Sequence, residues 1–194
     1  MTTSGTTSFG LPIDEIVTDA YRMIGNVNPT GDNLRTAKRE LDLMLIDWNN
    51  RGLNIWAVDN VLVSVSAATT TLAPTIQHVY DAVMIDGTTE TELTLIDEKT
   101  YIQYPNKTNT GKPSVFYVKL DRDAPKLVVW PVPAAATSIR LHVSRQLEDA
   151  GGVYNTIDVP RRYLNAIVLG LASAMAYAAP ALAPMLQERA ERAR

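Results

Sequence analysis

The stretch LDLMLIDWNNRGLNIWAVDNVLVSV, residues 41–65, contains the change of pattern that decides the fold. Its first half completes an apolar stripe at helical spacing, formed by Leu34, Ala37, Leu41, Leu45 and Trp48. Gly52 follows at a position where glycine commonly ends a helix. In the second half, Val61, Val63 and Val65 recur at strand spacing. The sequence therefore predicts a helix that is followed directly by a β-rich region.

Further strands are predicted downstream of this stretch. The alternation of apolar and polar residues is cleanest over residues 139–144. Residues 114–120 and 126–130 have strand patterns, and residues 121–125 between them have turn chemistry. A short helix is predicted near residues 97–103. Connections of this length favour antiparallel pairing over crossovers between parallel strands.

Helical patterns flank the β-rich region on both sides. Upstream, apolar residues recur at helical spacing between Pro12 and Gly25, and the polar break at residues 28–32 separates them from the next helix. Downstream, an apolar helical pattern begins after Pro160. Residues 1–10 are rich in Thr, Ser and Gly, lack the features of a signal peptide and are predicted to be a flexible arm.

These patterns together predict an α+β fold with three zones. The zones are an N-terminal helical pair at 11–52, a central antiparallel β-rich region at 53–146 and C-terminal helices at 158–186. We expect them to form one domain over residues 11–186, followed by a short tail at residues 187–194.

Residues 163–187 carry no charged side chain, and the run is long enough to raise the question of a transmembrane helix. Alanine dominates it, however, and alanine contributes little to membrane insertion compared with leucine or phenylalanine. Pro180 and Pro184 interrupt it. We therefore predict a buried helix and no membrane span.

The composition offers little for catalysis. The net charge of −3, from 18 basic and 21 acidic residues, argues against a protein that reads nucleic-acid sequence. The absence of cysteine excludes disulfides and thiolate chemistry. His142 falls on the polar face of a predicted strand, and His78 falls in a loop-like stretch after Pro74. Since the motifs of nucleophile elbows and phosphate-binding loops are also missing, we predict no enzyme, no cofactor and no metal site.

Residues 81–99 form an acidic stretch with a local charge of −5, because six acidic residues stand against the single base Lys99. The six are Asp81, Asp86, Glu90, Glu92, Asp97 and Glu98. A solvated acidic hairpin is the favoured interpretation. The sharper alternative is an acidic wall that faces a DNA channel and repels phosphates, so that DNA slides without sticking. Catalysis by paired carboxylates, including Asp14 and Glu15, ranks last.

Two segments of the sequence indicate more about the function than the composition does. The first is residues 41–65, quoted above. The second is residues 127–176, which contain VVWPVP, then SIRLHVSRQLED and then IDVPRRYLNAIVLGLASAMA. Between them, Gly111-Lys112-Pro113 precedes the aromatic strand Val115-Phe116-Tyr117. In order and spacing, these segments resemble the head-to-tail adaptor family of tailed bacteriophages, also called packaged-DNA-stabilisation proteins or tail accessory factors.

The resemblance implies a structural ring subunit, normally present in twelve copies, that docks beneath the portal protein and meets tail nozzle, tube or fibre proteins below. It also implies a virion component at the head–tail interface, assembled in the host cytoplasm, which extends the DNA channel, helps to retain the packaged genome and lets DNA pass without sequence recognition. The runner-up function is a head-completion or tail-tube connector of a long-tailed phage. A wall hydrolase that uses acidic residues is the alternative from another class.

Ring assembly gives two further sets of residues a candidate role. Balanced charges on the second helix could pair between neighbouring subunits; they are Arg35, Lys38, Arg39, Glu40, Asp42, Asp47 and Arg51. The polar and basic residues of the tail, which we expect to order only on binding, could dock to the portal; they are Gln187, Arg189, Arg192 and Arg194.

Overall fold

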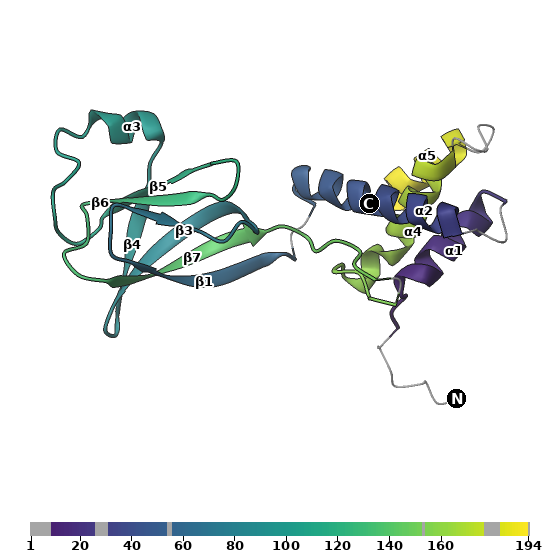
Figure 1. Ribbon diagram of the computed structural model, residues 1–194, viewed down its shortest axis with the longest axis horizontal. Helices are drawn as coiled ribbons and strands as arrows, with labels where there is room; N and C mark the ends of the chain where they lie inside the picture. Colours follow the sequence, from purple (N-terminus) through teal and green to yellow (C-terminus); the bar gives the residue numbers. More distant parts are fainter. Residues whose placement is uncertain (1–8, 26–30, 54–55, 153, 177–182, 194) are drawn as a thin grey trace. The chain divides into compact units, whose positions relative to one another are not determined.

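The computed structural model describes residues 9–25, 31–53, 56–152, 154–176 and 183–193. They form a mixed α+β fold, with helices at the two ends of the sequence and a central, curled seven-stranded sheet (Figure 1). The predicted fold class is confirmed. The chain divides into two compact units, one formed by Met1–Trp56 with Leu147–Arg194 and the other by Ala57–Gln146. The predicted boundaries of the arm, domain and tail stay predictions.

The first unit is helical. Its elements are α1 (Ile13–Met23), α2 (Gly31–Asn50), the 3-10 turn η1 (Arg161–Tyr163), α4 (Leu164–Met175) and α5 (Ala183–Ala193). Pro12 precedes the first residue of α1, and Gly25 follows the helix with a φ of 85°, which glycine adopts without strain. The predicted apolar stripe of α2 is buried except at Leu34, which is partly exposed, and Trp48 at its end is 1% exposed.

Helix α4 forms the centre of this unit, because it contacts α1, α2 and α5. Nearly all of its side chains are buried. An added Cβ at Gly170 would lie 2.7 Å from Met44 Sδ, so the missing side chain lets α4 approach α2 closely. The apolar run that suggested a membrane helix therefore contains a buried core helix, and no helix in the described part of the chain is long and apolar enough to span a membrane.

The second unit is the sheet. Its strands are β1 (Val58–Val65), β2 (Thr69–Thr71), β3 (Ile76–Asp86), β4 (Thr89–Leu95), β5 (Val115–Lys119), β6 (Lys126–Trp130) and β7 (Thr137–Arg145), and α3 (Glu98–Gln103) lies between β4 and β5. The strand order is β1-β7-β3-β4-β5-β6-β2. Most neighbours pair antiparallel, as expected, but β4 and β5 pair in parallel at Thr94–Val115 and Leu95–Phe116. The long connection through α3 provides the room that a parallel pair requires.

One face of the curled sheet holds the apolar core of the second unit. Its most buried side chains include Phe116, Leu127, Val129, Ile139, Leu141 and Val143. They come from β5, β6 and β7, where residues at alternate positions point to the same face. The period-2 patterns recognised in the sequence therefore correspond to the inner face of the sheet.

The predicted loop position of His78 is wrong, because His78 lies in β3. Two register shifts in the pairing with β7 leave Gln77 and Tyr80 as extra residues. These bulges break the regular alternation of apolar and polar residues. As a result, the first half of β3 does not have a strand pattern in the sequence.

Candidate interaction surfaces

The six acidic residues of the predicted channel wall lie along the β3–β4 hairpin and at the start of α3. Two of them form ion pairs, since Lys112 Nζ lies 2.6 Å from Asp86 Oδ2 and Arg140 Nη1 lies 2.5 Å from Glu90 Oε1. Both pairs are substantially exposed and therefore contribute little to stability. Their main effect is to offset part of the negative charge of the hairpin.

Asp97 has a structural role as the N-cap of α3. Its Oδ1 accepts a hydrogen bond of 2.9 Å from the backbone N–H of Thr100. Asp81, Glu92 and Glu98 form no ion pair with any described residue and are the free carboxylates of the set. The two ion pairs, and not the cap, therefore make the acidic stretch less negative than its sequence suggests.

Hydrogen bonding lowers the pKa of Asp97 below its ordinary value of 3.8, because Thr100 donates to the carboxylate. Because the pKa of Asp97 is lower in the folded protein than in the unfolded chain, its carboxylate stabilises the fold at pH values above the unfolded-state pKa. This stabilisation is lost as the pH falls through the folded-state pKa. A carbon-13 NMR titration of the Asp97 carboxyl should thus give a midpoint below 3.8.

A peptide of residues 95–104 supplies the control for this titration, since its isolated carboxyl should titrate near the ordinary value of 3.8. Equal midpoints in the protein and in the peptide would contradict the capping role.

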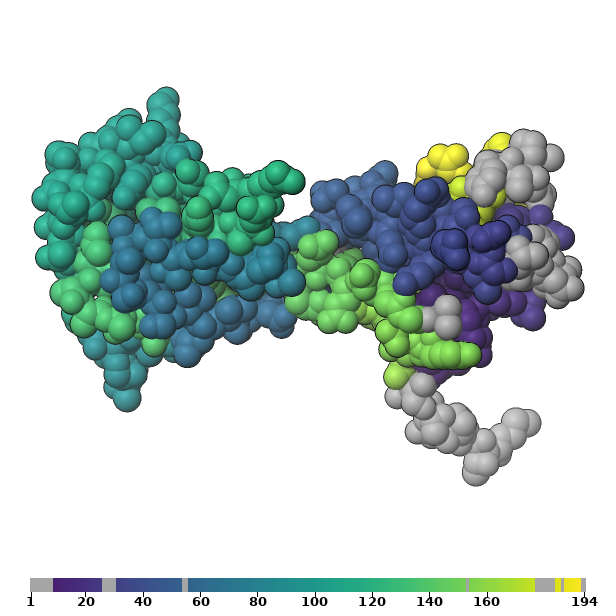
Figure 2. Space-filling view, in the orientation of Figure 1, coloured from purple at the N-terminus to yellow at the C-terminus, as the bar shows by residue number. Residues whose placement is uncertain are grey.

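The candidate charges on α2 mostly pair within the helix. Arg51 lies 2.9 Å from Asp47, Arg39 lies 3.2 Å from Glu40, and Arg35 lies 4.0 Å from Asp32. All three pairs contain well-exposed side chains. In the space-filling view, α2 lies at the surface of the helical unit (Figure 2).

Lys38 and Asp42 have a different position from the other charges of α2. Lys38 Nζ donates a hydrogen bond to Gly151 O, and Asp42 Oδ1 accepts one of 2.8 Å from Ala150 N. The two side chains, one helical turn apart, thereby hold the segment that follows β7 against α2. These contacts within the chain give both residues a structural role.

The exposed side of α2 also carries apolar side chains that the sequence analysis did not select. Leu43 is 52% exposed and Ile46 is 46% exposed. They lie outside the buried stripe, three residues apart and therefore on one helical face. Leu43 also lines a groove of about 350 Å³ between α2, α4 and α5, together with Glu40, Gln187 and Glu191.

The residues of the predicted portal-docking tail lie on α5, except Arg194, which falls outside the described residues. Gln187, Arg189 and Arg192 are exposed, and Arg192 Nη2 lies 2.5 Å from Glu188 Oε1. Ala190 between them is 3% exposed. The sequence predicted that these residues order only on binding, whereas here they form the last turns of a packed helix.

The two histidines lie on the outer face of the sheet, beside Tyr80. The Tyr80 ring centroid is 4.8 Å from that of His78 and 5.7 Å from that of His142. His142 Nδ1 lies 3.1 Å from Asn60 Oδ1. No group of three or more metal-binding side chains occurs among the described residues.

The three tryptophans all contact neighbouring groups within their own unit. Trp48 is buried, as expected, and Trp56 lies against Tyr163 with ring centroids 4.8 Å apart. The Trp130 ring lies 4.3 Å from that of Tyr104, and its Nε1 donates a hydrogen bond of 2.8 Å to Asn106 O. Trp130 is only half-buried.

A family model described as SU10 adaptor protein matches residues 12–194, which is nearly the whole chain. No curated protein matches the chain.

Proposed function

This chain belongs to the SU10 adaptor protein family, and from that membership we propose that it is a structural head-to-tail adaptor of a tailed bacteriophage. The observation that carries the proposal is the match over residues 12–194, which includes both compact units. In this function twelve copies of the subunit form a ring that docks beneath the portal. The ring extends the DNA channel, helps to retain the genome and offers the tail a platform. It performs no chemical step.

Contacts between neighbouring subunits are proposed for the exposed side of α2. A ring uses heterologous contacts, in which one face of a subunit meets a different face of the next. Leu43 and Ile46 offer apolar area for such a contact, and the exposed arginines Arg35 and Arg39 can set its register. Lys38 and Asp42 are engaged within the chain and contribute least.

The acidic stretch of residues 81–99 remains the candidate for the channel wall. Asp81, Glu92 and Glu98 are the carboxylates that would repel DNA phosphates. Because exposed charges are screened over about 8 Å at physiological salt, the effect requires DNA to pass close to the hairpin.

The experiment that tests the function mixes the purified chain with the portal ring of its virion and images the product by electron microscopy. The expected result is a symmetric ring of twelve copies added to one end of the portal. The proposal would be contradicted if the chain did not bind the portal even when its concentration was well above that of the portal.

Portal docking through α5 has its own test. The double variant Arg189→Glu with Arg192→Glu reverses two exposed charges. If these residues meet acidic groups on the portal, the variant should bind the portal at least tenfold more weakly. This loss corresponds to about 1.4 kcal/mol of binding free energy. The matched control is Arg122→Glu, an exposed arginine in the turn between β5 and β6. Unchanged portal binding by the α5 variant would exclude docking through these arginines.

A further inference from the structure

The sheet contains a gap where β4 ends. The pairing of β3 with β4 runs from Ala82–Leu93 to Asp86–Thr89, and that of β4 with β5 stops at Leu95–Phe116. After Leu95 the chain leaves the sheet and enters α3. Among the described residues, no strand therefore pairs with the edge of β3 over residues 76–81 or with the facing edge of β5 over residues 117–119.

A cleft of about 510 Å³ occupies this gap. Val79 of β3 and Val118 of β5 line its two sides, and Leu95 lines the end from which β4 departs. Neighbouring strands in a sheet lie about 4.8 Å apart, so two strands separated by one missing strand lie about 10 Å apart. The cleft thus continues the line of β4, where a regular sheet has room for one more strand.

The backbone of β5 presents hydrogen-bonding groups to this cleft. Ser114 O and Phe116 O accept hydrogen bonds of 2.9 Å from Thr94 N and Ile96 N, so these carbonyl groups point toward β4. Backbone N–H and C=O groups point to alternate sides from one residue to the next along a strand. Those of Val118 therefore point to the same side as Ser114 O and Phe116 O, at a level where β4 has ended. An unpaired edge of this kind is a template for an added strand.

The edge of β3 is irregular over the same length. Both of its bulges, at Gln77 and Tyr80, lie in the half that lacks a partner on the cleft side. Bulges are frequent at sheet edges and beside functional sites, where they redirect the strand.

The cleft lining combines apolar side chains with two carboxylates, and Gln77 and His78 are its other polar members on β3. Leu95 is 50% exposed and Leu120 is 75% exposed, although both are large apolar residues. Asp97 and Glu98 also line the cleft, whereas its described lining contains no lysine or arginine. The pKa of Tyr117, another lining residue, is raised by burial and then by the charge of Glu98.

We propose that this cleft is a docking site for an extended segment of a partner protein, which adds a strand between β3 and β5 and places a lysine or arginine beside Asp97 and Glu98. Main-chain hydrogen bonds give such a complex its affinity, and side-chain pockets give it specificity. Charge complementarity selects a cationic segment, and Leu95 and Leu120 select apolar side chains at alternate positions. The inference concerns the sheet alone and does not require ring assembly.

The probe is a synthetic peptide in which valine alternates with threonine and lysine, Thr-Val-Lys-Val-Lys-Val-Thr, blocked at both ends. Added to the full-length chain, it should bind with a Kd at or below roughly 1 mM and slow the exchange of the Val118 amide at least about tenfold. The same peptide with alternate backbone nitrogens methylated keeps its side chains but cannot form a complete ladder. It should bind at least about tenfold more weakly.

A protein variant tests the charge. Asp97→Asn combined with Glu98→Gln removes both charges, and asparagine caps a helix as well as aspartate does, so α3 keeps its start. Peptide binding should weaken at least about threefold, whereas Glu92→Gln on β4, outside the cleft lining, should change it less than about twofold.

Three results would overturn the proposal. One is the absence of binding, and another is equal binding of the methylated peptide. The third is protection of the Val118 amide that rises with protein concentration without peptide, because this would assign the cleft to a second copy of the chain.

Discussion

Replacement of Phe116 by alanine is expected to lower the free energy of unfolding by about 3–5 kcal/mol. Phe116 is 1% exposed and lies in the apolar core of the sheet, paired with Val129 on β6 and with Leu95 on β4. The substitution removes a whole ring from a position where β4, β5 and β6 meet, so the surrounding strands cannot close the cavity. Equilibrium unfolding in urea, followed by circular dichroism, measures the loss.

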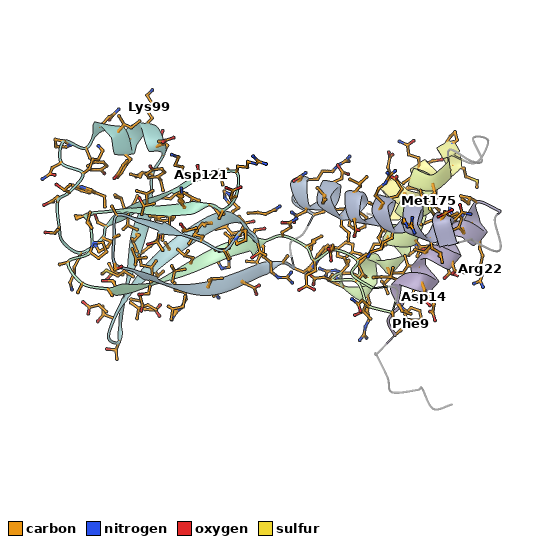
Figure 3. The ribbon with its side chains drawn as sticks, viewed as in Figure 1. Phe9, Asp14, Arg22, Lys99, Asp121 and Met175 are labelled. Atoms are coloured by element: carbon orange, nitrogen blue, oxygen red, sulfur yellow. The ribbon has the colours of Figure 1, made fainter. Side chains whose placement is uncertain are left out.

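The chain contains one other phenylalanine, which serves as a matched control. Phe9 precedes α1 and is 68% exposed (Figure 3). Phe9→Ala should change the unfolding free energy by less than about 0.5 kcal/mol. Losses of similar size for the two variants would show that Phe116 does not hold the sheet together.

The parts of the fold that the sequence predicted are those in which one face of an element is buried. The stripe on α2, which is buried from Ala37 to Trp48, lies on a single helical face and became part of a core. The alternation at Ile139, Leu141 and Val143 likewise places apolar side chains on one face, and these also became part of a core. The start of α3 was also predictable, because Asp97 has the chemistry of an N-cap.

Features set by contacts distant in sequence were not predictable. The parallel pairing of β4 with β5 involves strands separated by α3 and its flanking loops, and no local pattern encodes it. The bulges at Gln77 and Tyr80 depend on the register with β7, and they concealed the strand that contains His78. The cleft beside β4 follows from both features, so no sequence pattern indicates it either.

The candidate charges illustrate the same limit. The sequence shows that α2 has a balanced set of charged residues, but it does not show which of them have partners elsewhere in the chain. Lys38 and Asp42 contact Gly151 and Ala150, more than one hundred residues away. Leu43 and Ile46 could have been noticed, because they are apolar residues that fall outside the buried stripe.

The second large loss of stability is expected from a substitution of Asp42. Asp42→Ala should lower the unfolding free energy by about 2 kcal/mol, because the Ala150 N–H loses its acceptor. Ala150 is 1% exposed, so water cannot readily replace the carboxylate. Urea unfolding measures the loss, and faster amide exchange at Ala150 would locate it.

Asp42→Asn is the control that separates two roles for this residue. The asparagine oxygen can still accept the hydrogen bond, although a neutral acceptor contributes less than a charged one. If Asp42 acts within the chain, Asp42→Asn should cost no more than about 1 kcal/mol and leave assembly with the portal unchanged. If Asp42 instead pairs with a neighbouring subunit, loss of its charge should weaken assembly in both variants alike. Since the hydrogen bond from Ala150 is already present in the single chain, we expect the first result.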